Sequence, residues 1–244
     1  MNILGVIPAR YDSKRFPGKP LADLSGRTVI EWVYSAAASC PHFDRVLVAT
    51  DDERIAECVR GFGGEVELTR ADHATGTDRV AEVAARYPDA DVVANVQGDQ
   101  PFVSAEHLSD LLAPYLEGLS PAMTTLACHL DPARAPDSNV VKVVCDREGN
   151  ALYFSRAQIP FATGSEQPDY LHHLGLYAFR ADFLQTYAGF ASTPLEEYEQ
   201  LEQLRVIEHG YRIAVCKTDQ AVLEVNTPED LEHAVALVAR TGGS

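Results

Sequence analysis

Four cationic side chains lie close together after the first apolar segment of the chain. Residues 7–21 read IPARYDSKRFPGKPL, and the cations among them are Arg10, Lys14, Arg15 and Lys19. In open α/β sheets, ligands bind beyond the carboxyl ends of the strands, which is where this segment would lie. Guanidinium and ammonium groups suit the charges of a triphosphate. We therefore predict a triphosphate-binding loop; a solvated basic loop is the alternative, less expected in a chain of net charge −16.

Two common phosphate-binding motifs do not fit this loop. Gly18-Lys19 is followed by Pro20, and Ser13 stands where the first glycine of a P-loop would fall. A G-x-G-x-x-G motif after a strand is also missing from the sequence. A dinucleotide-binding fold is therefore disfavoured.

An acidic residue follows the fourth predicted strand. Residues 95–101 read NVQGDQP, so that Asp99 comes directly after a glycine. A carboxylate in this position can hold Mg²⁺, which takes one or two carboxylates together with substrate phosphates. The alternative is an acid that only caps a helix or stabilises a turn. The residue types leave both open.

Two further segments contain residues suited to binding. Residues 72–79, DHATGTDR, place small hydroxyl side chains around Gly76, which would let a base or ribose approach the backbone. A helix N-cap at Thr75 or Thr77 explains the same residues equally well. Residues 151–156, ALYFSR, place Arg156 beyond an aromatic strand, where it could hold a substrate carboxylate.

The elements around these segments alternate between strands and helices. We expect strands over 3–8, 45–50, 65–68 and 91–97, and helices over 28–38, 52–61, 77–87 and 104–116. This alternation predicts a parallel βαβ sheet. The pattern then changes to strands joined by loops, at 122–128, 140–145, 151–154 and 173–179, followed by a helix over 194–210, a strand near 213–215 and a helix over 227–240.

Length and composition exclude several classes of protein. The 244 residues fit one α/β domain, 1–244, in which an inserted β-rich lobe occupies roughly residues 120–210. A net charge of −16 disfavours binding to nucleic acid, and no apolar run is long enough for a membrane span. The five cysteines are dispersed and odd in number, which predicts reduced thiols and a cytoplasmic location.

Taken together and in order, the segments resemble the 3-deoxy-manno-octulosonate (Kdo) cytidylyltransferases, which make CMP-Kdo for lipopolysaccharide. The resemblance extends from about residue 3 to residue 232. It includes PARYDSKRFPGKPL at 8–21, ATDDERI at 49–55, TRADHATGTDR at 69–79, NVQGDQP at 95–101, NVVKVV at 139–144, ALYFSRAQIPF at 151–161, HLGLYAFR at 173–180, LEQLR at 201–205 and NTPEDLE at 226–232.

The resemblance implies a fold and a set of residue roles. The fold would be Rossmann-like, of the nucleotide-diphospho-sugar transferase type: a mostly parallel sheet flanked by helices, with the inserted lobe forming a sugar lid and the contact of a homodimer. CTP would be bound by Ala9, Arg10, Arg15, Lys19, Thr75, Arg79 and Gln97, and Mg²⁺ by Asp99. The catalytic residues would be Arg10, Lys19 and Asp99, and the acidic sugar would contact Arg156, His173, Tyr177, Glu202 and Gln203.

From the residue types alone, we interpret His173 as a strand histidine whose hydrogen bonds are made within the protein. Glu202 and Gln203 are interpreted as residues on the surface of a helix. No side chain stands out as a general base. Transfer would therefore depend on positioning and electrostatics, with the sugar C2 hydroxyl attacking the α-phosphorus as pyrophosphate leaves.

Two positions depart from the family pattern. Gln100 replaces a glutamate, and Asn226 replaces an aspartate that serves as a second metal ligand in the family. The amide oxygen of Asn226 can still coordinate Mg²⁺ as a second ligand, but it brings no negative charge, and Mg²⁺ prefers charged oxygens. Three hypotheses follow: a Kdo enzyme with a weakened metal site, an enzyme for another acid sugar such as the 8-amino analogue, or a non-catalytic nucleotide-binding homologue. If the missing charge weakens metal binding, Asn226→Asp should lower the Mg²⁺ requirement.

A different class of enzyme also deserves comparison. Sugar-phosphate and molybdenum-cofactor nucleotidyltransferases have a basic loop after the first strand, but theirs is usually glycine-rich before the arginine. Here the residues are Pro8-Ala9-Arg10, and those enzymes lack the ALYFSR and HLG segments.

Overall fold

The computed structural model describes residues 1–12, 15–164 and 167–241. The chain divides into two compact units: residues 1–108 with 222–244, and residues 109–221. We call them the first and second units and describe each by itself.

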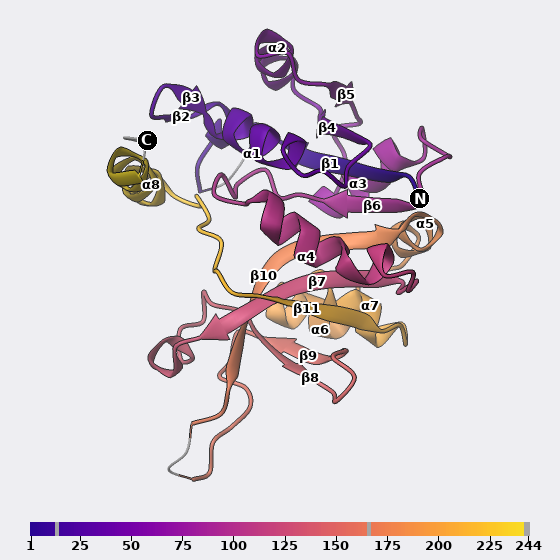
Figure 1. Ribbon diagram of the computed structural model, residues 1–244, viewed down its shortest axis with the longest axis vertical. Helices are drawn as coiled ribbons and strands as arrows, with labels where there is room; N and C mark the ends of the chain where they lie inside the picture. The colour runs from indigo at the N-terminus through magenta and orange to yellow at the C-terminus, as the bar shows by residue number, and fades with distance from the viewer. Residues whose placement is uncertain (13–14, 165–166, 242–244) are drawn as a thin grey trace. The chain divides into compact units, whose positions relative to one another are not determined.

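The first unit is built on four parallel strands. Their order is β6 (Val92–Asn95), β1 (Ile3–Ala9), β4 (Arg45–Thr50) and β5 (Val66–Leu68) (Figure 1). All seven residues of β1 are buried, as expected for a strand with neighbours on both edges and helices packed against it. The parallel sheet predicted from the first half of the sequence is therefore confirmed.

Helices connect these strands. They are α1 (Val29–Ala38), α2 (Glu53–Gly61) and α3 (Gly76–Ala84), while α4 (Ala105–Leu116) starts in this unit and α8 (Pro228–Thr241) returns to it. The unit also contains the 3₁₀ turn η1 (Lys19–Leu21) and a hairpin of β2 (Asp23–Leu24) with β3 (Arg27–Thr28), which the sequence did not predict. Helices α1 and α3 both pack on β1 and β4.

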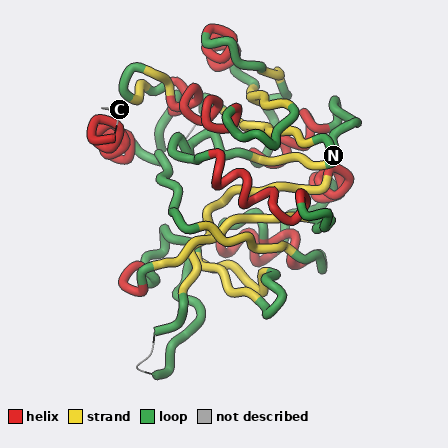
Figure 2. Tube along the Cα trace, viewed as in Figure 1, coloured by secondary structure: helices red, strands yellow, loops and turns green. Residues whose placement is uncertain are grey.

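The second unit is a mixed sheet centred on β7 (Met123–Leu130). This strand pairs in parallel with β11 (Ile213–Thr218) and antiparallel with β10 (Tyr170–Arg180), which pairs in turn with β8 (Lys142–Cys145) and then β9 (Ala151–Ser155). Among the described residues, loops rather than helices lie between β8 and β9 and between β9 and β10 (Figure 2), as the sequence predicted. The 3₁₀ turn η2 (Pro132–Arg134) follows β7.

The helices of the second unit differ from those predicted. The single helix expected over 194–210 is wrong: α6 (Pro194–Glu199) and α7 (Leu204–Glu208) are separate, because Gln200 is left-handed, with φ of 54°, and ends α6. The helix α5 (Ala181–Ala188) was not predicted. The five cysteines are free, and no helix in the described ranges is long and apolar enough to cross a bilayer.

Candidate functional site

A glycine brings the ends of β1 and β6 close together in the first unit. A Cβ built on Gly98 would lie 2.7 Å from the carbonyl oxygen of Pro8, a contact that no other residue type could accept without movement. The register pairs Val6 on β1 with Asn95 on β6. The segment that carries Gln97 and Asp99 is therefore held against the strand end from which the basic loop leaves.

The basic loop is joined to this segment by an ion pair. The Nζ atom of Lys19 donates to Asp99 Oδ2 at 2.8 Å, and the two side chains are 12% and 28% exposed. Gly18 is left-handed, with φ of 72°, and its N–H donates to the carbonyl of Tyr11 at 2.9 Å, which closes the loop. The structure thus pairs two residues that the sequence predicted as catalytic.

The other cations of the loop lie at the surface. Arg10 is exposed, and no ion pair of Arg10 is found within the described residues. Arg15 is exposed as well, and its Nη2 donates to Asn226 Oδ1 at 2.9 Å. Lys14 lies outside the described residues. Arg10 and Arg15 therefore present guanidinium groups to solvent, where an anion could reach them.

Asn226 also contacts a carboxylate that the sequence analysis missed. Its Nδ2 donates to Glu224 Oε2 at 2.8 Å, and Gln100 Nε2 donates to Glu224 Oε1 at 3.2 Å. Although Glu224 is exposed as a residue, loss of hydration at its carboxylate and the negative charge of Asp99 raise its pKa. The N–H of the next residue, Val225, donates to the carbonyl oxygen of Asp99 at 2.8 Å, which holds this segment beside Asp99.

These groups suit a magnesium ion in their chemistry. Mg²⁺ prefers oxygen ligands and takes one or two carboxylates with substrate phosphates. Asp99 and Glu224 supply carboxylates, and Asn226 supplies an amide oxygen. Groups of three or more His, Cys, Asp or Glu side chains able to hold a metal are not found in the described ranges. Two carboxylates and an amide oxygen fit an ion that takes its remaining ligands from substrate phosphates and water.

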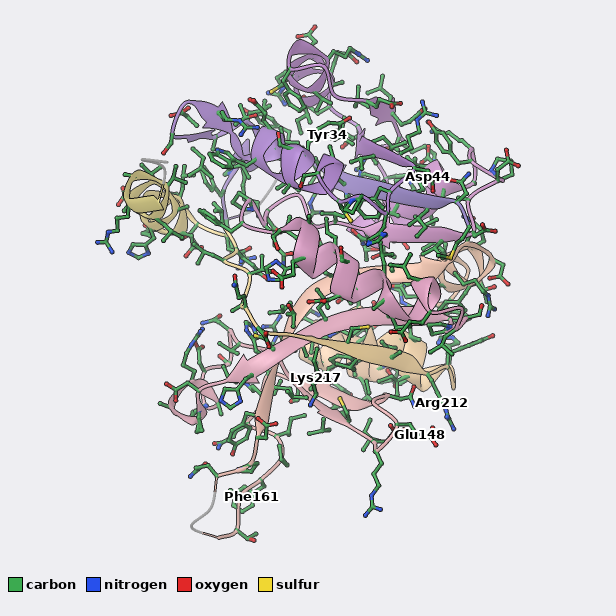
Figure 3. The ribbon with its side chains drawn as sticks, in the orientation of Figure 1. Tyr34, Asp44, Glu148, Phe161, Arg212 and Lys217 are labelled. Carbon is green, nitrogen blue, oxygen red and sulfur yellow. The ribbon has the colours of Figure 1, made fainter. Side chains whose placement is uncertain are left out.

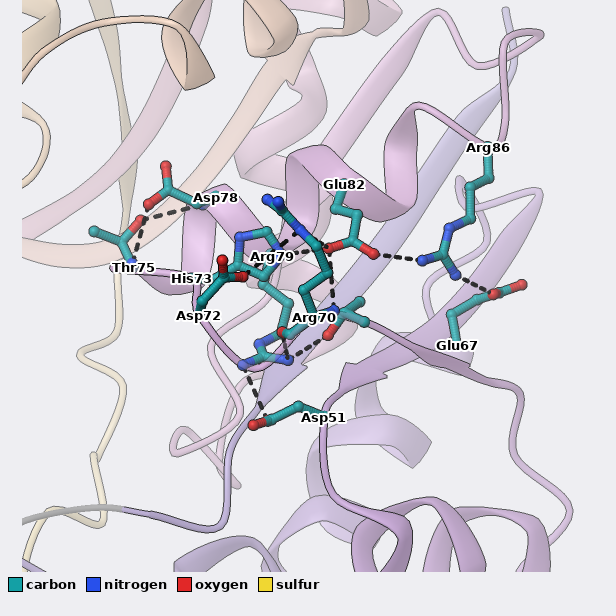
Figure 4. Close-up of polar contacts among 11 residues, drawn as sticks. Asp51, Glu67, Arg70, Asp72, His73, Thr75, Asp78, Arg79, Glu82 and Arg86 are labelled. Atoms are coloured by element: carbon teal, nitrogen blue, oxygen red, sulfur yellow. Dashed lines mark hydrogen bonds and ion pairs between the residues drawn. The ribbon is translucent and has the colours of Figure 1, made fainter.

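Arg79, which we predicted to help fix cytidine, is 4% exposed and contacts protein groups (Figure 4). Its guanidinium pairs with Asp51 Oδ1 at 3.0 Å, donates to the carbonyl of Arg70 at 3.3 Å and also donates to Thr69 Oγ1. Burial lowers its pKa. The structure assigns Arg79 to positioning the 69–70 segment, and its contact with cytidine stays a prediction.

Thr75 begins helix α3 as its N-cap. Its hydroxyl accepts from the N–H of Asp78 at 3.1 Å, and the Asp78 carboxylate accepts from the N–H of Thr75 at 3.1 Å, which completes a capping box. The helix-cap interpretation of this segment is confirmed.

The side chain of Gln97 has a defined orientation. Its Nε2 contacts Asn95 Oδ1 at 3.5 Å, and Asn95 Nδ2 in turn donates to Thr77 Oγ1 at 2.9 Å.

Three of the predicted sugar-pocket residues form a buried network in the second unit. Tyr177 Oη donates to Gln203 Oε1 at 3.0 Å, Gln203 Nε2 lies 3.4 Å from His173 Nδ1, and His173 Nε2 lies 2.9 Å from Thr125 Oγ1. Because the Thr125 hydroxyl donates to the carbonyl of Leu176, it accepts from His173. His173 is thus neutral with its proton on Nε2, and burial lowers its pKa to about 3.

Arg156 has a different environment in the same unit. Its Nε donates to the carbonyl of Glu199 at 2.8 Å and its Nη1 to the carbonyl of Ser138 at 3.1 Å. The buried Lys142 also holds the backbone here: its Nζ donates to the carbonyls of Asp137, Val140 and Arg156 at 2.6–2.8 Å. Among the described residues, the hydrogen bonds of the Arg156 side chain therefore go to backbone carbonyls and not to the His173 network.

Lys142 and Glu224 are the residues that sequence reasoning missed. Lys142 lies in the NVVKVV segment, where a cation inside an apolar strand was a signal that it needs buried partners. Burial lowers its pKa. The sequence indicated Glu224 less clearly: only its position, two residues before Asn226, suggested that it lies near the predicted metal site.

Comparison with known proteins gives consistent results. The family model described as "Cytidylyltransferase" matches residues 4–213. The 3-deoxy-manno-octulosonate cytidylyltransferase of Acaryochloris marina is 61% identical over 236 residues, covering 96% of each chain, and that of Syntrophotalea carbinolica is 52% identical over 246 residues, covering 97% of this chain and 98% of its own.

Solved structures agree with this assignment. The structure of CMP:2-keto-3-deoxy-manno-octonic acid synthetase complexed with CTP superposes with a TM-score of 0.95 at 39% identity, covering 99% of this chain and 100% of its own. The 4-diphosphocytidyl-2C-methyl-D-erythritol synthase of Anaerococcus prevotii, at 15% identity and a TM-score of 0.66, covers 98% of this chain and 99% of its own and shares the fold. The predicted Rossmann-like fold of the nucleotide-diphospho-sugar transferase type is therefore confirmed.

Proposed function

The chain belongs to the cytidylyltransferase family, and we propose that it transfers CMP from CTP to the anomeric 2-hydroxyl of Kdo, releasing pyrophosphate. The observation that carries the proposal is the Lys19–Asp99 pair at the adjoining ends of β1 and β6, beside the exposed Arg10 and Arg15. The names of the relatives, and the CTP in the similar solved structure, support the choice of nucleotide and sugar.

The cationic loop would bind the triphosphate. Arg10, Arg15 and Lys19 carry three positive charges on one loop, and these stabilise the charge that builds up on the leaving pyrophosphate. Mg²⁺, when bound with CTP, neutralises phosphate charge and orients the α-phosphate. Asp99, with Asn226, would hold that ion. The salt bridge to Lys19 keeps the Asp99 carboxylate in place until substrate binds.

The transfer itself is an in-line displacement at phosphorus. The oxygen of the sugar 2-hydroxyl forms a bond to the α-phosphorus, the bond from that phosphorus to the bridging oxygen of the β-phosphate breaks, and the hydroxyl proton passes to solvent. Gln97, Ala9, Thr75 and Arg79 are proposed to fix cytidine. Arg156, His173, Tyr177, Glu202 and Gln203 are proposed to line the sugar pocket, in which the network around His173 gives rigid support.

We further propose that the product serves lipopolysaccharide synthesis and that the enzyme is a cytoplasmic homodimer. Five free thiols agree with a reducing compartment. The inserted lobe at residues 120–210 falls within the second unit, which we propose provides the dimer contact.

Pyrophosphate release with CTP, Mg²⁺ and a panel of 2-ulosonic acids tests the function. We expect turnover with Kdo, and a loss of at least about 100-fold in kcat/KM for Asp99→Asn, since electrostatic groups at a reacting phosphate have effects of this size. Asp89→Asn removes the same charge from an exposed turn and should leave the activity unchanged.

The panel also separates the alternatives. Turnover only with the 8-amino analogue would replace Kdo as the acceptor. Retained CTP binding without turnover of any sugar would show a non-catalytic homologue and overturn the proposal.

A further inference from the structure

The side chains of Arg15, Asn226, Glu224 and Gln100 form a continuous hydrogen-bonded chain. Arg15 donates to the oxygen of Asn226 at 2.9 Å, and the amide nitrogen of Asn226 donates to Glu224 at 2.8 Å. Gln100 donates to the other carboxylate oxygen of Glu224 at 3.2 Å. Glu224 therefore accepts from both residues that depart from the family pattern.

These contacts explain why residue 226 is an amide here. Its oxygen faces a cation and its nitrogen faces an anion, and a short side chain can satisfy both only if it carries an acceptor and a donor. An aspartate at 226 would place a carboxylate oxygen about 2.8 Å from that of Glu224, where two like charges repel. A glutamate at 100 would meet the same carboxylate. A carboxylate at position 224 therefore disfavours further carboxylates at positions 100 and 226.

The position of Glu224 relative to Asp99 is fixed by the backbone. The N–H of Val225, which is fully buried, donates to the carbonyl oxygen of Asp99 at 2.8 Å. Glu224 and Asn226 flank this anchored residue. Together they carry one negative charge, the same as a single aspartate at position 226.

We propose that Glu224 is a positioning residue of the CTP–Mg²⁺ site. It supplies the second carboxylate charge beside Asp99 and accepts from the Asn226 nitrogen, which leaves the Asn226 oxygen for the cations of the site, Arg15 and Mg²⁺. The inference rests on the proposed function, since it assigns a role in the same site. It also reverses the expectation for Asn226→Asp: with Glu224 present, that change adds a repelling charge and does not strengthen metal binding.

A double-mutant cycle tests the pairing. Mn²⁺ is titrated into the full chain with CTP and without sugar, and free Mn²⁺ is measured by electron paramagnetic resonance, so that the readout does not depend on turnover. We expect Glu224→Gln to weaken Mn²⁺ binding by about 10-fold, the size found when groups that orient metal ligands are removed. Asn226→Asp alone should bind Mn²⁺ no more tightly than the unaltered chain. The double variant Glu224→Gln with Asn226→Asp should recover a Mn²⁺ affinity within about 3-fold of that of the unaltered chain.

The matched control is Glu229→Gln, which removes the same charge from an exposed position in the first turn of α8. Equal Mn²⁺ affinities for the Glu224→Gln and Glu229→Gln variants would overturn the proposal. The proposal would also be overturned if Asn226→Asp increased the Mn²⁺ affinity by the same factor in the unaltered chain and in the Glu224→Gln variant. Thermal unfolding followed by circular dichroism checks that each variant folds. If one single variant is unstable, the double variant can still be compared with the other single variant and with the unaltered chain.

The outcomes for the proposed function remain separate. An unaltered chain that releases no pyrophosphate with any sugar would overturn the function, while the Mn²⁺ titrations would still report on Glu224. Normal turnover with a Glu224→Gln variant that binds Mn²⁺ like the unaltered chain would overturn only the role of Glu224.

Discussion

At the scale of single residues, several side chains predicted to touch substrate contact other protein groups. Arg79 holds Asp51 and the 69–70 segment, and Arg156 holds the backbone carbonyls of Glu199 and Ser138. Such a residue can still affect catalysis by fixing the backbone around the substrate. By contrast, Arg10 and Arg15 are exposed and accessible to an incoming phosphate, although Arg15 also donates to Asn226.

The charge state of Glu82 depends on the residues that contact it. It contacts His73 Nε2 at 2.5 Å, Arg86 at 2.5 Å and the N–H of Arg70 at 3.2 Å (Figure 4). Burial alone would raise the pKa of Glu82, but the hydrogen bonds from His73 and Arg70 outweigh it and lower the pKa to about 2.

This pKa predicts a pH-dependent contribution to stability. A lowered carboxyl pKa stabilises the fold above the ordinary value of 4.5, and this contribution is lost as the pH falls from 4.5 toward 2. Glu82→Gln should therefore lower the free energy of unfolding by about 1–3 kcal/mol at pH 7, and the difference from the unaltered chain should shrink below pH 4.5. Urea unfolding at pH 7, 5 and 3 measures this, with the exposed Glu57→Gln as control. A difference that stays constant with pH would contradict it.

At the scale of elements, the capping box of α3 gives Thr75 a structural role that can be separated from binding. Thr75→Ala removes the cap and Asp78→Ala removes its reciprocal bond, without changing residue 75. Each should lower the free energy of unfolding by about 1 kcal/mol, as measured by urea unfolding.

The two variants should differ in their effect on CTP. If Thr75 also contacts cytidine, Thr75→Ala should raise the KM for CTP several-fold more than Asp78→Ala, and Thr75→Ser should keep both properties. Equal KM values for the two alanine variants would show that Thr75 acts only as a helix cap.

At the scale of the whole molecule, the charge balance of −16 contrasts with the cationic loop. A strongly acidic surface repels anions in general, so binding of CTP and of an acidic sugar must depend on local cations such as Arg10, Arg15 and Lys19. Large apolar side chains are also exposed in the second unit: Leu152 at 59%, Phe161 at 83% and Tyr198 at 83% (Phe161 is labelled in Figure 3). Exposed apolar groups of this size are suited to a contact between subunits.

The proposed dimer can be measured directly. Sedimentation velocity should give a mass about twice the 26.6 kDa of the chain, and the double variant Leu152→Asp with Phe161→Asp should shift the species toward monomer. Leu119→Asp changes another exposed leucine of the same unit, at 61% exposure, and should have no effect. A monomer of the unaltered chain at micromolar concentration would rule the dimer out.

The sequence by itself determined the parallel sheet, the basic loop after β1 and the acid after β6. These depend on local patterns: continuous apolar runs specify buried strands, and a loop that follows such a strand must lie at its carboxyl end. The pairing of Lys19 with Asp99 agrees with this rule, but it also requires β1 and β6 to be neighbours, which the structure shows and the sequence did not predict. A helix N-cap at Thr75 or Thr77 was predictable for the same reason, because a cap depends on residues within one turn; the structure places it at Thr75.

Only the tertiary structure decided which distant polar groups meet. Gln100 and Glu224 are 124 residues apart, and Arg15 and Asn226 are 211 apart, so no local pattern indicates their contacts. The left-handed Gln200 that divides the predicted helix was equally hidden, because a non-glycine residue adopts this conformation only when its surroundings compensate for the strain. Long-range packing fixed these features. It also placed the Glu224 carboxylate beside the uncharged side chain of Asn226.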